Sequence, residues 1–118
     1  MNSYNKGKIA EFMARMYMRL HGYRIIDTNY ITGRGSTAGE IDFIAKRWNT
    51  IVFVEVKQRE SLNNAAYAIL PHQQERILRG ARSYLQHHPQ YRHCQMRFDA
   101  ILIAFPWQIR HISNAWHI

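Results

Sequence analysis

The sequence predicts an α/β fold in which helices flank a central mixed β-sheet, and its length of 118 residues predicts one domain, residues 1–118. Two segments carry apolar residues at three- and four-residue spacing, the pattern of amphipathic helices. Five short segments rich in β-branched and aromatic residues have the pattern of strands. The predicted order is helix, three strands, helix, strand and one extra C-terminal strand.

The first predicted helix covers residues 6–21. Gly22 ends it, because glycine readily adopts the backbone conformation that closes a helix. A short strand follows at 24–30, and the glycine-containing segment 32–37 is predicted as a loop. The apolar face of the helix consists of Ile9, Phe12, Met13, Met16, Tyr17 and Leu20.

The second half of the chain adds a helix and two strands. Pro71 begins the helix, because proline is favoured at a first helical position, and the helix ends near His88. Strands are predicted at 97–105 and 108–113, with a turn at Pro106 between them.

The chain is strongly basic, with 16 Lys and Arg against 8 Asp and Glu and a net charge of +8. This charge predicts a polyanionic partner, nucleic acid before an anionic membrane, and an acidic protein is the alternative. No apolar stretch approaches the roughly 20 residues that a membrane helix needs, so no membrane partner is expected. The single cysteine and the lack of an apolar leader predict a cytoplasmic location.

A hairpin is predicted in the middle of the chain, with strands at 39–46 and 51–58 and a four-residue loop at 47–50. Both strands are largely apolar, yet each carries charged residues near the same end of the hairpin. Because side chains alternate along a strand, the charged residues of each strand share one face. They are Glu40, Asp42, Glu55 and Lys57.

The hairpin register places Asp42 opposite Glu55 and Glu40 opposite Lys57. Opposed side chains have Cβ atoms about 5 Å apart, and two carboxylates at that distance repel unless a cation lies between them. Mg²⁺ binds one or two carboxylates together with waters and phosphate oxygens. The register therefore predicts a divalent metal between Asp42 and Glu55, with Lys57 beside it. The alternative is an ion pair of Glu40 with Lys57 and two carboxylates at a solvated sheet end.

The two strand motifs, Gly-Glu-Ile-Asp-Phe-Ile-Ala at 39–45 and Val-Phe-Val-Glu-Val-Lys-Gln-Arg at 52–59, resemble those of the YraN-type bacterial proteins. These are predicted nucleases similar to archaeal Holliday-junction resolvases, within the restriction-endonuclease-like PD-(D/E)xK superfamily. The resemblance extends to residues 10–11, 97–99 and 114–115. It implies a restriction-endonuclease-like core of helix, three strands, helix and strand.

The resemblance implies an endonuclease that depends on Mg²⁺, with Mn²⁺ as a substitute, and that hydrolyses phosphodiester bonds in DNA, including branched or junction DNA. Asp42, Glu55 and Lys57 are then the catalytic residues. Asp42 and Glu55 hold the metal, and Lys57 orients the attacking water and stabilises charge on the phosphate. The alternative is a non-catalytic nucleic-acid-binding protein that retains the nuclease fold.

Supporting roles are less sharply defined. The resemblance nominates Glu11 as a third metal ligand, whereas its spacing from Arg15 predicts a surface ion pair. Glu40 and Gln74 are candidates for support of the site, although a solvated helix position is the default for Gln74. Asp99 is expected either in an ion pair with its neighbour Arg97 or behind the site, outside the catalytic set.

Four cationic residues flank the predicted site in sequence and are the predicted nucleic-acid contacts: Arg34, Lys46, Arg47 and Arg59. Trp48, at the hairpin tip, is expected either to stack on a base or to cap the core. DNA is favoured over RNA as the partner. Since junction resolvases act as two-fold dimers, the resemblance also implies a homodimer.

Overall fold

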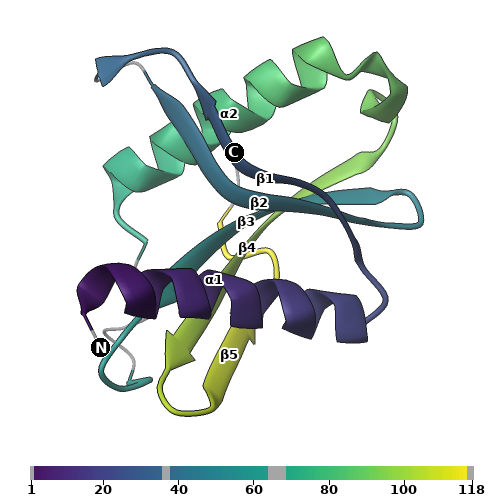
Figure 1. Ribbon diagram of the computed structural model, residues 1–118. Helices are drawn as coiled ribbons and strands as arrows, with labels where there is room; N and C mark the ends of the chain where they lie inside the picture. Colours follow the sequence, from purple (N-terminus) through teal and green to yellow (C-terminus); the bar gives the residue numbers. More distant parts are fainter. Residues whose placement is uncertain (1, 36–37, 64–68, 117–118) are drawn as a thin grey trace.

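The computed structural model describes residues 2–35, 38–63 and 69–116, which form two α-helices, one 3₁₀ turn and five strands (Figure 1). No helix in these ranges is long and apolar enough to cross a membrane. In chain order the elements are α1 (Ser3–Leu20), β1 (Arg24–Thr32), β2 (Gly39–Arg47), β3 (Thr50–Gln58), α2 (Pro71–His87), the 3₁₀ turn (Pro89–Tyr91), β4 (Gln95–Ala104) and β5 (Gln108–Ile112).

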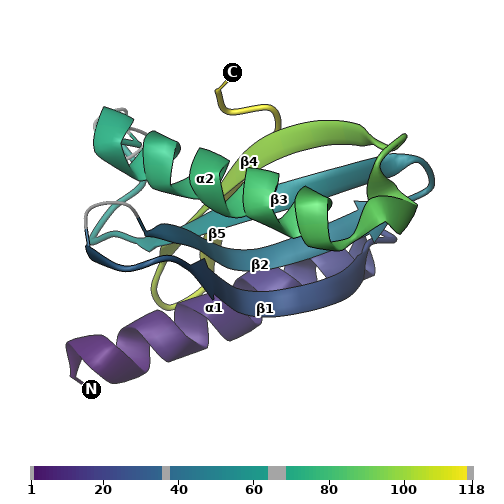
Figure 2. The same cartoon turned by 90° about the horizontal axis from the view of Figure 1, so that it is seen from above.

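The strands form one mixed sheet in the order β1-β2-β3-β4-β5. β3 and β4 are parallel and α2 connects them, whereas the other neighbours are antiparallel. Figure 2 shows α1 and α2 on opposite faces of the sheet. The predicted α/β architecture and its extra C-terminal strand are therefore confirmed, and the arrangement is that of a restriction-endonuclease-like core.

Most predicted elements agree with the structure to within two or three residues. The helix predicted from residue 6 begins earlier, at Ser3, because the Asn2 side chain caps it by accepting a hydrogen bond from the backbone N–H of Asn5 (2.8 Å). Residues 36–37 of the predicted loop 32–37 lie outside the described residues.

The four-residue loop predicted at 47–50 is wrong. Arg47 and Thr50 are paired residues of β2 and β3, which leaves Trp48 and Asn49 as a two-residue turn. Trp48 has a φ of 52°, the positive value that tight hairpin turns require. The Trp48 side chain is 86% exposed, so it does not cap the core.

β3 is the central strand, and its apolar side chains pack on both helices. On the α2 side, Phe53 lies in a buried cluster with Ile77 and Tyr84. On the α1 side, Val54 lies in a second cluster with Met18. Burial on both faces explains the nearly continuous apolar run of this strand.

The start of β2 touches α2 backbone to backbone at two glycines. A Cβ added at Gly39 would lie 2.8 Å from the Cα of Gly80 and 2.9 Å from the carbonyl carbon of Arg79. Real Cβ atoms do not approach backbone so closely, so the absence of a side chain at Gly39 sets the distance between β2 and α2.

We expect Gly39→Ala to separate α2 from β2 and to destabilise the fold by roughly 1–3 kcal/mol, the usual cost of overpacking. Chemical denaturation monitored by circular dichroism measures the change. The control is Gly7→Ala in α1, where an added Cβ meets nothing within 4 Å and alanine favours the helix. Equal stability of the two variants would contradict the close contact.

Candidate active site

The candidate site lies where β2 and β3 part. β2 pairs with β1 along its length, from Lys46 to Gly39, but its register with β3 runs only from Arg47 to Phe43. Beyond that point the Asp42 side chain accepts a hydrogen bond from the backbone N–H of Val56 (2.7 Å). A carboxylate thus completes the contact between the two strands where they diverge.

The divergence opens a cavity of about 230 Å³ beneath the first turns of α2. The predicted facing of Asp42 and Glu55 is confirmed, because their side chains interact directly in this cavity. The Lys57 ammonium lies 3.5 Å from Oε1 of Glu55, and both of these side chains are largely buried. The polar residues that line the cavity are Glu40, Asp42, Glu55, Lys57, Gln73 and Arg76.

The two facing carboxylates repel one another. Burial, followed by repulsion from Glu55, raises the pKa of Asp42 to about 8, although the Val56 N–H and Lys57 act in the opposite direction. Lys57 therefore does not compensate the pair fully, and one proton or another cation is needed near neutral pH.

The donor set fits a hard divalent cation. Asp42 and Glu55 offer carboxylate oxygens, which Mg²⁺ prefers, and a cation placed between them would remove the repulsion that raises the Asp42 pKa. The rest of the coordination would come from water and substrate oxygens, as Mg²⁺ commonly requires.

Glu11, the predicted third metal ligand, lies in a second cavity on the α1 side that Glu40 and Asp42 also line. Burial, followed by the charge of Asp42, raises the pKa of Glu11. In the described ranges, no group of three or more His, Cys, Asp or Glu side chains is arranged to hold a metal ion. The structure therefore places Glu11 near Asp42 without joining it to the Asp42–Glu55 pair.

The polar residues that α2 contributes to the cavity do not include Gln74, the one that was predicted. The side-chain amide of Gln74 donates to the carbonyl of Ile69 (2.7 Å), whereas its neighbour Gln73 lines the cavity. Glu40 does not pair with Lys57, because its Oε2 accepts a hydrogen bond from Nη2 of Arg76 (2.7 Å).

The four predicted nucleic-acid contacts fall into two groups. Arg34 precedes β2 and Arg59 follows β3, so both come from segments adjoining the ends of the strands that carry the carboxylates. Lys46 and Arg47 lie at the opposite end of the hairpin, about 13 Å or more from Asp42 along the strand. There Arg47 donates to the carbonyl of His21 (2.8 Å).

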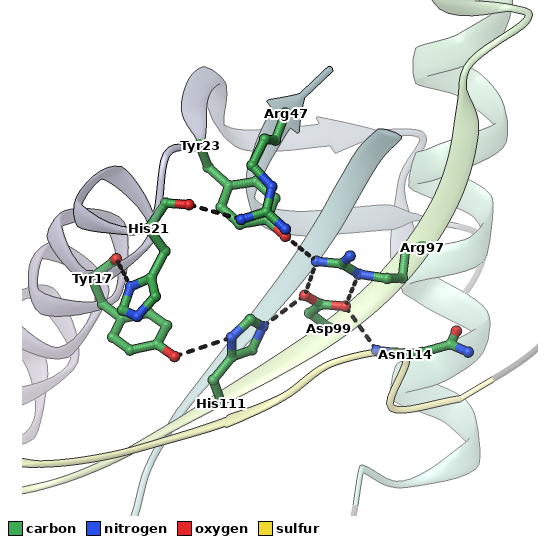
Figure 3. Close-up of polar contacts among 8 residues, drawn as sticks. All are labelled: Tyr17, His21, Tyr23, Arg47, Arg97, Asp99, His111 and Asn114. Carbon is green, nitrogen blue, oxygen red and sulfur yellow. Dashed lines mark hydrogen bonds and ion pairs between the residues drawn. The ribbon is translucent and has the colours of Figure 1, made fainter. Parts of the chain in front are cut away.

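A separate polar network surrounds Asp99 on the α1 side of the sheet (Figure 3). Asp99 is fully buried and accepts two hydrogen bonds from Arg97 (2.8 and 2.9 Å) and one from the backbone N–H of Asn114 (2.9 Å). Nε2 of His111 donates to it as well (2.7 Å), and the Tyr17 hydroxyl lies 3.3 Å from the other ring nitrogen.

This network is structural. Burial alone would raise the pKa of Asp99, but the hydrogen bonds from His111, Arg97 and Asn114 outweigh it and hold the pKa below its usual value. The expected ion pair of Asp99 with Arg97 is confirmed. Because it joins β4 to β5 and to α1, the network anchors the C-terminal strand.

The fold and the carboxylate–lysine cluster define a protein with a restriction-endonuclease-like core. The chain belongs to the uncharacterised protein family UPF0102, whose model matches residues 10–103. It is 44% identical to a UPF0102 protein of Paramagnetospirillum magneticum, over 96% of this chain and 88% of that protein. It is also 44% identical to a UPF0102 protein of Bradyrhizobium diazoefficiens, over 97% of this chain and 83% of that protein. The YraN-type resemblance is thereby confirmed.

Sequence reasoning missed Gln73 and Arg76. Both belong to the helix that connects β3 to β4, and only the packing of that helix on the sheet decides which of its residues face the cavity. A partial signal existed, because positions 73, 76 and 77 lie on one side of a helix and Ile77 is apolar.

Proposed function

We propose that this protein is a Mg²⁺-dependent endonuclease that hydrolyses phosphodiester bonds in DNA. The observation that carries the proposal is the pair of facing carboxylates, Asp42 and Glu55, with Lys57 beside them in a cavity at the end of a strand. The net charge of +8 supports a polyanionic substrate. We propose branched DNA as the preferred form of the substrate. We also propose a cytoplasmic location, with which a DNA substrate and a single cysteine are in keeping.

Each residue has a distinct role in this proposal. Asp42 and Glu55 hold the cation, and the N–H of Val56 orients the Asp42 carboxylate. When bound, Mg²⁺ supplies polarisation of a phosphate oxygen and lowers the pKa of a water. Lys57 places a positive charge beside the phosphate and stabilises the negative charge that develops on its oxygens.

The test is cleavage of labelled duplex, flap and four-way-junction DNA in the presence of Mg²⁺ or Mn²⁺. We expect Glu55→Gln and Lys57→Gln each to reduce the rate by roughly 10²-fold or more, because each removes charge from the reacting centre. The control is Glu75→Gln, which neutralises an exposed carboxylate of α2 and should leave the rate unchanged. Cleavage that survives the Glu55 substitution would rule out this site.

A nucleic-acid-binding protein without turnover is the second candidate. It is favoured by the finding that, among the described residues, no group of three or more His, Cys, Asp or Glu side chains is arranged to hold a metal ion. It predicts salt-dependent DNA binding by the unaltered chain, no cleavage with either metal, and little change in affinity on Glu55→Gln.

A further inference from the structure

Arg76 enters the cavity from α2, on the side opposite the hairpin that carries the carboxylates. The cavity lining includes Arg76 together with Asp42, Glu55 and Lys57, although the segments come from different parts of the chain. Arg76 is thus a second cationic side chain at the candidate site, contributed by a different element from Lys57.

The guanidinium of Arg76 is only partly used. Its Nη2 donates to Oε2 of Glu40 (2.7 Å), whereas its Nε is buried and has no hydrogen-bond partner among the described residues. A buried N–H without an acceptor costs free energy. The Nε–H and Nη–H groups of one guanidinium edge together match two oxygens of a phosphate or carboxylate.

Glu40 is a replaceable partner for this guanidinium. The side chains of Glu40 and Arg76 are about half exposed, at 48% and 43%, so their ion pair is weakened by solvent. Glu40 also lines the second cavity, the one on the α1 side of the sheet that Asp42 lines as well. Its carboxylate therefore adds to the negative charge around Asp42 and Glu55. A phosphate group that takes its place on Arg76 would satisfy Nε with one oxygen and Nη2 with another.

We propose that Arg76 binds the non-bridging oxygens of the phosphodiester on which the site acts, and that it exchanges Glu40 for this phosphate when the substrate arrives. The inference rests on the proposed function, since it assigns the phosphate-binding residue of the same site. Glu40 holds the guanidinium at the cavity in the free protein, and Lys57 stays with Glu55 on the hairpin.

The first test compares Arg76→Gln with Arg82→Gln. Arg82 is an exposed arginine of the same helix, outside the cavity, so the two variants lose the same charge. We expect Arg76→Gln to lower kcat/KM by about 10- to 100-fold, the effect of losing a charged hydrogen-bond pair, and Arg82→Gln to lower it less than about threefold. Arg76→Lys keeps the charge but loses the pair of guanidinium N–H groups that binds two oxygens. Its kcat/KM should remain at least about fivefold below that of the unaltered chain.

A binding titration supplies a readout that needs no turnover. Fluorescent DNA is titrated at several KCl concentrations, with Ca²⁺ in place of Mg²⁺. The logarithm of the association constant falls linearly with the logarithm of the salt concentration. Loss of one phosphate contact makes this line shallower by about 1, and we expect this change for Arg76→Gln. Equal effects of Arg76→Gln and Arg82→Gln on both kcat/KM and the slope would overturn the assignment.

The exchange itself is tested by a double-mutant cycle. Glu40→Gln should tighten DNA binding several-fold, because Arg76 then has no ion pair to break before it binds the phosphate. In the Arg76→Gln background the same change should do no more than Glu75→Gln, the control for charge alone. A Glu40→Gln effect that is the same in both backgrounds would overturn the exchange.

Failure of the inference differs from failure of the proposed function. Absence of metal-dependent cleavage by the unaltered chain would overturn the nuclease, whereas the titration would still measure the Arg76 contact. Cleavage that is insensitive to Arg76→Gln would leave the nuclease in place and overturn the role of Arg76.

Discussion

Asp42→Asn is expected to abolish the metal-dependent cleavage that we propose and, in the same protein, to raise the melting temperature when EDTA is present. Asparagine removes the charge that repels Glu55 and keeps an oxygen that accepts the hydrogen bond from the Val56 N–H. A pKa of about 8 in the folded chain against about 4 in the unfolded chain would correspond to about 5 kcal/mol at pH 8, and relaxation around the buried pair reduces the gain that we expect to roughly 2 kcal/mol, or about 8 °C in Tm. A cluster arranged for catalysis at the expense of stability has this signature.

The stability that the protein gains from Asp42→Asn is expected to depend on pH. Burial and then repulsion from Glu55 raise the folded-state pKa of Asp42 to about 8, against about 4 in an unfolded chain. The stability that Asp42 contributes is present in full below about pH 4 and is lost as the pH rises through about 8. The asparagine side chain of the variant does not titrate, so the advantage of Asp42→Asn should grow from about pH 5 to about pH 8.

Differential scanning calorimetry in EDTA across this pH range measures the advantage. Glu75→Gln serves as the control, because it removes an exposed carboxylate and should shift Tm equally at all these pH values. In the unaltered chain, Mg²⁺ should recover the lost stability at pH 8, and in Asp42→Asn it should recover little. A variant that melts at or below the unaltered chain at pH 8 would contradict the repulsion.

Asp99→Asn is expected to destabilise the fold by about 3 kcal/mol, because it removes the negative charge that Arg97 and His111 share and replaces one of the two buried acceptor oxygens with an N–H donor. For a domain of this length the loss corresponds to roughly 12 °C in Tm. Asp99 holds β5 through His111 and Asn114. In the Asp99→Asn variant we therefore also expect the backbone amides of β5 to exchange with solvent faster than those of β2 and β3.

The effect of Asp99 has the opposite pH dependence from that of Asp42. The pKa of Asp99 is lowered in the folded state, so its contribution is present above the unfolded value of about 4 and is lost as the pH falls through the folded value. The gap between Asp99→Asn and the unaltered chain should therefore be largest near pH 7 and should shrink below pH 4. Urea titrations at several pH values measure it, and a gap that widens toward acid would contradict the ionised network.

The sequence predicted the helices, the strands and the register of the central hairpin because these depend on local patterns. Counting back from the hairpin loop placed Asp42 opposite Glu55 even though the predicted loop was two residues too long. The register survived this error because lengthening or shortening a symmetric loop leaves the paired residues unchanged.

The residues that α2 contributes could not be predicted in the same way. Gln73 and Gln74 are adjacent, and only the rotation of the packed helix directs one into the cavity and the other back to Ile69. The partner of Glu40 was also missed, because β2 parts from β3 before Glu40 reaches Lys57. Tertiary placement, which has no local signal, decides both.

The backbone contact between Gly39 and Gly80 has a consequence for the width of the cavity. The two glycines lie between the strand that carries Asp42 and the helix that carries Arg76, and neither of them lines the cavity. The spacing of the two cavity walls is therefore set by two positions outside the lining, so a side chain added at either glycine would alter the site without replacing any of its polar groups.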